Sequence, residues 1–393
     1  MRFLHTADWH LGRTLGGAPF LPEQEWLLCG AFLDMVRDTR PDAVIIAGDI
    51  FDRSVPPTDA VRLLDDLLAR IIRGQGVPVV LIPGNHDDPA RLSFAASLLR
   101  PAGLHIADSA LGVPFPLADA HGEVWIAPSG YASPPLLAQL LAPVLGDPVL
   151  GDPALGDPAL PDHDQGFAVL CRMLQAQIPE GARRVMVAHG FVAGGEESGS
   201  ERALAVGGAR PVSATRFAGF DYVALGHLHR AQSMAEGRIA YSGSPLAYSF
   251  AEAGQPKSVA LVEMDATGGI TSQALPLIPR SRLRVLNGPL ETLLAERDPA
   301  TAGDWLRVVL TDPGAVWEPM ARLREAFPNL LELAFARHAA LDAPPGPATP
   351  AAPAVDALEL LRAFHLATGR GPLPEAALPI ARAAIEAAEA AEA

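Results

Sequence analysis

Short apolar runs alternate with longer amphipathic stretches over about the first 110 residues of the chain. The runs at 3–7, 43–47 and 77–82 are apolar without alternation, which predicts strands that are buried on both faces. Residues 23–38 and 58–73 have the length and the apolar spacing of helices. This order of strand, helix, strand and helix indicates an α/β fold.

A second series of apolar runs follows, with shorter intervals between its members. The predicted strands cover residues 124–127, 184–188, 221–224, 238–242 and 258–263. We interpret them as a second sheet that packs on the first. The predicted fold class is therefore α/β, a two-sheet α/β sandwich with helices on the outside.

After about residue 275 the pattern changes. Strands are predicted at 284–286, 305–310 and 331–336, around a helix at 317–326, as in a small α+β domain. A Pro/Ala-rich stretch then predicts a stiff linker. The predicted domains are 1–275, a capping domain at 276–340, the linker at 341–354, and a helical tail at 355–393.

The tail holds two amphipathic patterns, at 355–367 and 374–391, and the first places Leu358, Leu361 and Phe364 on one face. Such helices bury little surface alone, so the tail is predicted to fold back or to dock on a partner.

Residues 145–161 form a near-perfect five-residue repeat built on Leu-Gly-Asp-Pro. Its aspartates superficially resemble calcium ligands, but nothing else in the run fits a calcium loop. Gly-Asp-Pro favours turns, and we predict an expanded, mobile surface loop.

Composition limits the cellular setting. The chain is 49% hydrophobic and 19% charged, with no apolar stretch long enough to span a membrane and no signal-peptide pattern. Two distant cysteines, Cys29 and Cys171, give no disulfide framework. These features predict a soluble, cytoplasmic protein.

The charged residues say little about the binding partners of the protein. A formal net charge of −15 argues mildly against nucleic-acid binding. Arginines at 183–184 and 280–284 are candidates for phosphate contact, although ordinary solvated arginines are the commoner case. The only lysine, Lys257, follows Gln255-Pro256 and does not belong to a P-loop. Any ATP hydrolysis would therefore belong to a partner.

Seven residues able to bind metal each follow a short apolar run. They are Asp8, His10, Asp49, Asn85, His189, His227 and His229. Ligands at the carboxyl ends of strands lie where α/β folds build their sites. Mixed oxygen and imidazole ligands suit two divalent ions that a carboxylate such as Asp49 bridges, as in a phosphoesterase.

The order DxH, GDxxD, GNHD, H and GHLH resembles the calcineurin-like metallophosphoesterase superfamily. Longer segments are similar to the SbcD family, the nuclease subunits of bacterial SbcCD complexes among the double-strand-break repair nucleases. These segments are LHTADWHLG (4–12), AGDIFDRSVPP (47–57), GSERALAVGGARPV (199–212), FAGFDYVALGHLHR (217–230) and YSGSPLAYSF (241–250).

The resemblance implies roles for the site residues. One metal site would use Asp8, His10, Asp49 and His229, and the other Asp49, Asn85, His189 and His227. His86 would orient the phosphate or protonate the leaving oxygen, with Asp87 holding its ring. The two divalent ions would be Mn²⁺.

The resemblance also implies an activity and partners. The substrate would be DNA, with 3′-to-5′ exonuclease activity on double-stranded ends and endonuclease activity on single strands and hairpins. The protein would form a homodimer bound to two SbcC-type coiled-coil ATPases. Two alternatives stay open: a phosphatase or phosphodiesterase of the same superfamily acting on small molecules or phosphoproteins, and a non-enzymatic scaffold.

Overall fold

The computed structural model describes residues 1–141, 163–201, 211–336, 358, 361–362, 365–366 and 372–392. It divides the chain into two units, Met1–Ala336 and Arg337–Ala393. The repeat at 145–161, the linker at 341–354 and most of the predicted helix at 355–367 lie outside the described residues. The expectations for those segments stay predictions.

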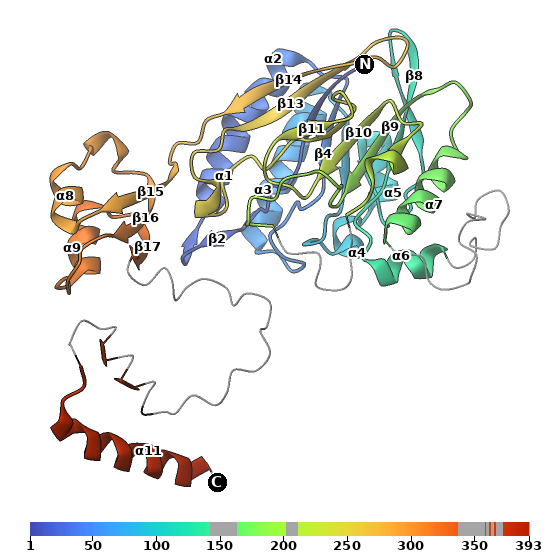
Figure 1. The fold of residues 1–393 in the computed structure, drawn as a ribbon. Helices are drawn as coiled ribbons and strands as arrows, with labels where there is room; N and C mark the ends of the chain where they lie inside the picture. The colour runs from blue at the N-terminus through green and yellow to red at the C-terminus, as the bar shows by residue number, and fades with distance from the viewer. Residues whose placement is uncertain are drawn as a thin grey trace. The chain divides into compact units, whose positions relative to one another are not determined.

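Two six-stranded sheets form the body of the first unit (Figure 1). In order across the first sheet lie β14 (Ile270–Leu277), β13 (Lys257–Met264), β1 (Arg2–Thr6), β4 (Ala43–Ala47), β5 (Val79–Ile82) and β6 (Leu104–Ile106). Across the second lie β11 (Gln232–Met234), β12 (Ile239–Tyr241), β10 (Tyr222–Gly226), β9 (Arg183–His189), β8 (Gly122–Pro128) and β7 (Phe115–Asp119). In both sheets the central strands are parallel.

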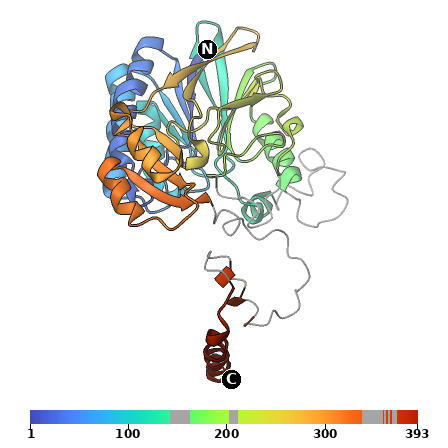
Figure 2. The same ribbon diagram turned by 60° about the vertical axis from the view of Figure 1, so that its left-hand side comes forward.

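Helices cover the outer faces of the sheets, and Figure 2 shows the N-terminal helices and α7 on opposite sides. The first group comprises α1 (Leu21–Leu27), a π-helical turn at Leu28–Phe32, α2 (Leu33–Thr39), α3 (Thr58–Ala69) and a second π-helical turn at Arg70–Gly74. The second group comprises α6 (Pro134–Leu141) and α7 (His163–Gln175). Short elements complete the unit: β2 (Thr14–Leu15), β3 (Ala18–Pro19), α4 (Pro89–Leu92), α5 (Ala96–Leu99), and 3-10 turns at Arg100–Ala102, Ala214–Phe217 and Phe250–Glu252.

The apolar patterns explain this layering. Within β4, Val44 and Ile46 pack toward the outer helices, whereas Ile45 joins the cluster between the two sheets. Both faces of the strand are buried, so its sequence is a continuous apolar run rather than an alternating one. In α3 the buried residues Ala60, Leu63, Leu64 and Leu67 follow helical spacing. The predicted two-sheet α/β sandwich is confirmed.

One strand was assigned to the wrong sheet. Residues 258–263 were predicted in the second sheet, but β13 pairs antiparallel with β1 in the first, with Phe3 opposite Val262. The connection from β12 to β13 spans 242–256 and crosses from one sheet to the other. Strand spacing along the chain does not reveal such a crossover, because the crossover depends on the unpaired edge of β1 in the first sheet.

A third, parallel sheet contains β15 (Leu283–Gly288), β16 (Trp305–Leu310) and β17 (Leu330–Phe335), with α8 (Leu290–Ala295), a 3-10 turn at Pro299–Thr301 and α9 (Pro319–Ala326). It has a hydrophobic cluster of its own, which includes Val308 and Leu323. The ring of Trp305 stacks on Phe20 with 5.6 Å between centroids. The boundaries expected for a capping domain stay a prediction.

The second unit contributes a 3-10 turn at Glu375–Ala377 and the helix α11 at Leu378–Glu392. None of the helices in the described parts of the chain is long and apolar enough to cross a membrane.

Candidate active site

The functional side chains stand on loops that leave the carboxyl ends of central strands in both sheets. His189 is the last residue of β9, and His227 directly follows β10. Backbone hydrogen bonds join the loops after β1 and β4: the Asp8 amide donates to the Gly48 carbonyl at 3.0 Å, and the His10 amide to the Asp49 carbonyl at 2.9 Å. Two rigid sheets therefore fix the site from both sides.

Four of the candidate ligands have backbone conformations that residues other than glycine rarely adopt. The φ angles are +54° at Asp8, +45° at His10, +48° at Asp49 and +109° at His227. Such conformations cost roughly 1–3 kcal/mol each and persist where the surrounding structure enforces them. Their concentration here marks this region as the functional site.

Gly226, the last residue of β10, permits the close approach of the two sheets. A Cβ atom there would lie 1.8 Å from the carbonyl oxygen of Ala47, and that oxygen contacts Nδ1 of His189 at 2.9 Å. The two sheets can meet at this point only because residue 226 has no side chain.

The Gly226→Ala variant is expected to lose about 1–3 kcal/mol in its free energy of unfolding, because a methyl group is forced into packed backbone. Binding of a divalent metal should fall as well, because the displaced Ala47 carbonyl no longer orients His189. Gly190→Ala is the matched control, since a Cβ at Gly190 meets nothing within 4 Å. Denaturant unfolding and Mn²⁺ titration check both expectations, and equal behaviour of the two variants would contradict the packing argument.

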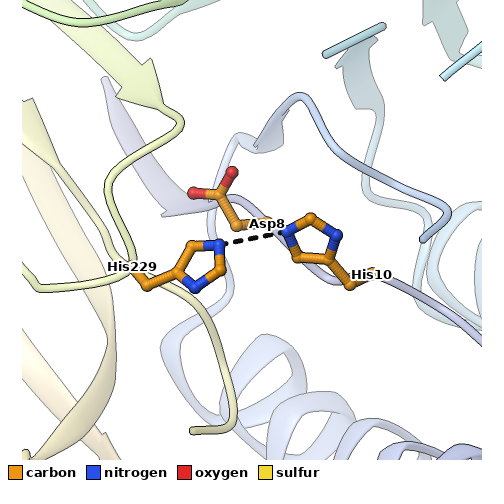
Figure 3. Close-up of side chains that lie close together, drawn as sticks. All are labelled: Asp8, His10 and His229. Carbon is orange, nitrogen blue, oxygen red and sulfur yellow. Dashed lines mark hydrogen bonds between the residues drawn. The ribbon is translucent and has the colours of Figure 1, made fainter. Parts of the chain in front are cut away.

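His10 and His229 face each other across the gap between the sheets. Their Nε2 atoms lie 3.1 Å apart, with Asp8 beside them (Figure 3). Donor atoms of Asp8, His10 and His229 all lie within 4.8 Å of one another. One ring can donate its Nε2 proton to the lone pair of the other, and when both protons sit on Nδ1 the two lone pairs can bind one cation.

A second group of donors lies next to the first. Nε2 of His189 is 3.5 Å from Oδ2 of Asp49 and 2.9 Å from Oδ1 of Asn85. Oδ1 of Asn85 is also 3.3 Å from Nδ1 of His227. Oδ2 of Asp49 lies 3.6 Å from Nε2 of His10, so Asp49 touches both groups. The structure thus brings all seven predicted ligands together, and the split into two metal sites stays a prediction.

The electrostatics suit a bound cation. Burial, together with the charge of Asp49, raises the pKa of Asp8 well above its usual value. Burial alone would raise the pKa of Asp49. The nearby His189 and His86 outweigh burial, so the pKa of Asp49 lies below its usual value. Burial lowers the pKa of His227 to about 3. Burial lowers the pKa of His10 and His189 as well, so these three imidazoles are neutral beside Asp8 and Asp49. Neutral imidazoles and carboxyl groups are donors that divalent ions favour.

The chemistry of the donors supports the same fit. Carboxylate oxygens and imidazole nitrogens of buried residues converge within 4.8 Å of one another. Such mixed oxygen and nitrogen donors bind divalent ions. The residues present therefore fit divalent metal ions.

The predicted role of Asp87 is wrong. Its carboxylate accepts hydrogen bonds from the backbone amides of Ile50, Phe51 and Gly84 at 2.9–3.0 Å, so it ties the loops after β4 and β5 together. The ring of His86 is held instead through Nδ1, which lies 2.7 Å from the carbonyl oxygen of Asp52. Three amides that point into one buried space attract the carboxylate more strongly than one imidazole does.

Several polar residues around His229 were not predicted from the sequence. Glu252 and Lys257 contact its ring and its backbone carbonyl, and Ser200 and Glu201 contact its ring and its amide. These residues precede or follow the ligand motifs by many positions. Two signals were available: Lys257, a lone lysine beside an apolar strand, and the segment 199–212, which contains Ser200 and Glu201.

Comparison with known proteins agrees with this geometry. The family described as Calcineurin-like phosphoesterase matches residues 1–231, more than half of the chain. The chain belongs to the calcineurin-like phosphoesterase family, and the site is that of a metal-dependent phosphoesterase. A second family, SbcD_C, described as Type 5 capsule protein repressor C-terminal domain, matches residues 279–362. The crystal structure of a dimetal phosphatase from Danio rerio is similar over 71% of this chain and 96% of its own, with 14% identity and a TM-score of 0.40.

Proposed function

We propose that this protein is a divalent-metal-dependent DNA nuclease, the SbcD-type subunit of a complex with an SbcC-type coiled-coil ATPase. One observation carries the proposal: a single chain joins the buried Asp/His/Asn site of a phosphoesterase to a C-terminal segment similar to the SbcD_C family. A phosphatase for small substrates has no need of such a segment. The expected reactions are exonuclease cleavage of double-stranded ends and endonuclease cleavage of single strands and hairpins.

The site residues divide into metal ligands and a proton-transfer group. One ion would be held by Asp8, His10, Asp49 and His229, and the other by Asp49, Asn85, His189 and His227. When bound, two divalent ions, which we propose are Mn²⁺, neutralise charge on a phosphoryl group and lower the pKa of water toward 7.

His86 would act on the substrate directly. The Asp52 carbonyl occupies its Nδ1, so a proton sits there and Nε2 faces the site, 4.0 Å from Oδ2 of Asp49. With a second proton on Nε2, His86 would donate a hydrogen bond to the scissile phosphate or protonate the leaving oxygen.

The decisive experiment compares three substrates in manganese buffer: a DNA hairpin, a bis-aryl phosphodiester and a nucleotide. We expect hairpin cleavage to be the fastest, and faster still with the partner ATPase and ATP. Preferred hydrolysis of the nucleotide or the aryl ester would instead assign the protein to the small-molecule phosphatases of the family.

The proposed homodimer has a candidate surface between α3 and the segment at 89–99. Phe94 and Leu98 are 82% and 78% exposed, and Val55 and Val61 are exposed beside an apolar groove. Clustered exposed apolar side chains mark interaction surfaces in soluble proteins.

Combined Phe94→Glu and Leu98→Glu substitutions are expected to convert the dimer to a monomer, because two charges would be buried unpaired at its centre. Light scattering after size-exclusion chromatography measures the mass. Trp317→Glu is the control, since Trp317 is 80% exposed in the loop before α9, outside the proposed surface. A dimer that survives the double substitution, or breaks with Trp317→Glu, would place the interface elsewhere.

The C-terminal tail at 355–393 is proposed to dock on the coiled coil of the ATPase. Protein lacking 341–393 should therefore fail to retain the ATPase in a pull-down while still cleaving the aryl phosphodiester. Undiminished retention would refute the docking role.

A further inference from the structure

His229 is held at its ring and at both of its backbone polar groups. Nζ of Lys257 donates to its carbonyl oxygen at 2.9 Å, and Oε1 of Glu201 accepts from its amide at 3.0 Å. Oε1 of Glu252 lies 3.2 Å from Nδ1 of its ring. The ring edge on the other side carries Nε2, which faces His10. The orientation of this one ligand is therefore fixed by residues far from it in sequence.

Glu252 and Lys257 form a buried ion pair. Glu252 is 0% exposed and Lys257 is 6% exposed, and Nζ donates to Oε2 of Glu252 and, at 3.0 Å, to Oγ of Ser244. Removing two charges from water costs about as much as their attraction returns, so an apolar pair of similar size would be no less stable. Stability alone does not explain why the chain places its only lysine here.

The chemistry of the pair points to the ring of His229. An ionised carboxylate only accepts hydrogen bonds, so contact with Glu252 requires the ring proton on Nδ1. The lone pair is then on Nε2, on the edge that faces His10 and the candidate metal site. Oγ of Ser200 also lies 2.8 Å from Nδ1, but a hydroxyl can donate or accept and therefore selects neither tautomer.

We propose that Glu252 and Lys257 are a positioning pair for His229: Glu252 fixes the proton on Nδ1, and Lys257 pairs with Glu252 and anchors the His229 carbonyl. The inference rests on the proposed two-metal centre and assigns these two residues a role in setting metal affinity at one of its sites. A carboxylate behind a metal-binding histidine raises the basicity of the ligand and fixes its orientation.

The first test measures the tautomer in metal-free protein. Nitrogen-15 NMR of labelled histidine reports which ring nitrogen carries the proton, and His229→Gln identifies the signals of His229 by their loss. We expect the proton on Nδ1 in the wild type and a mixture of tautomers in Glu252→Gln, because an amide can present either its oxygen or its NH₂ group. A proton on Nε2 in the wild type would overturn the inference.

The second test measures Mn²⁺ binding by titration of metal-free protein. The double variant Glu252→Gln/Lys257→Met leaves no unpaired charge and is expected to keep the melting temperature of the wild type. Its affinity for one of two Mn²⁺ ions should fall by about 10–100-fold, the usual effect of losing a partner of a metal ligand.

The matched control removes another buried ion pair far from the ligands. Asp119 and Arg183 are 5% and 7% exposed, and Nη2 of Arg183 lies 2.6 Å from Oδ1 of Asp119. Asp119 also pairs with the N-terminal ammonium, so the control changes Arg183→Met alone and keeps that charge paired. Arg183→Met should leave the affinity for both ions unchanged. Equal Mn²⁺ affinity in Arg183→Met and Glu252→Gln/Lys257→Met would overturn the positioning role.

Failure of the inference is distinguishable from failure of the proposed function. If the wild-type protein binds two Mn²⁺ ions but leaves DNA intact, the proposed nuclease function is refuted and the positioning role of Glu252 and Lys257 stands. Wild-type protein that binds no Mn²⁺ would refute the two-metal centre and, with it, the role in metal affinity. Nuclease activity together with unchanged Mn²⁺ affinity in Glu252→Gln/Lys257→Met would refute the pair alone.

Discussion

The Asp49→Asn variant is expected to cleave a DNA hairpin in manganese buffer at least about 10³-fold more slowly than the wild type, since losing even one preorganised electrostatic group costs about 10²–10³-fold. Asp49 has contacts with both donor groups, at 3.6 Å to Nε2 of His10 and 3.5 Å to Nε2 of His189. Asparagine keeps the shape and one acceptor oxygen but removes the charge. The lowered pKa of Asp49 means that this charge is present at neutral pH.

Stability in the presence of metal gives an independent measure of the same variant. A ligand that binds only the folded state raises the melting temperature, so Mn²⁺ should stabilise the wild type and stabilise Asp49→Asn much less. Asp59→Asn is the control, because Asp59 is an exposed aspartate at the start of α3. If metal-replete Asp49→Asn cleaves the hairpin within tenfold of the wild-type rate, Asp49 does not bridge two ions.

Local sequence patterns were sufficient to predict which candidate ligands the fold brings together. Asp49 and His189 each end or follow a strand whose apolar run is visible in the sequence, and parallel strands bring their carboxyl ends to one edge. The burial of both faces of β4 and β9 made those runs continuous, which is why their bounds were predicted to within a residue or two.

The residues that support the ligands could not be predicted from local sequence patterns. Asp87 is adjacent to His86 in sequence, yet its carboxylate contacts the amides of Ile50, Phe51 and Gly84. Only the folded loops show that three amides converge there. Lys257 reaches the His229 carbonyl because β13 joins the first sheet, whereas the order of strands along the chain predicts it in the second sheet. One wrong strand pairing therefore concealed the positioning pair.

The His86→Ala variant is expected to lower the rate of hairpin cleavage by about 10²–10⁴-fold, the usual contribution of a positioned proton-transfer group. Its affinity for Mn²⁺ should not change if the seven ligands are those proposed. Two hydrogen bonds hold His86. Its backbone amide donates to Oδ1 of Asp49 at 2.8 Å, and its Nδ1 donates to the Asp52 carbonyl. Replacing the side chain keeps the amide contact and removes only the ring.

The two measurements together separate chemistry from metal binding. His121→Ala is the control, because His121 is an exposed histidine in the turn between β7 and β8. Donor atoms of His10, Asp49 and His86 also lie within 4.8 Å of one another, so the geometry admits His86 as a ligand. Loss of one bound Mn²⁺ in His86→Ala would show that His86 is a metal ligand. Loss of cleavage with both ions retained would show instead that His86 acts on the substrate phosphate or on the leaving oxygen.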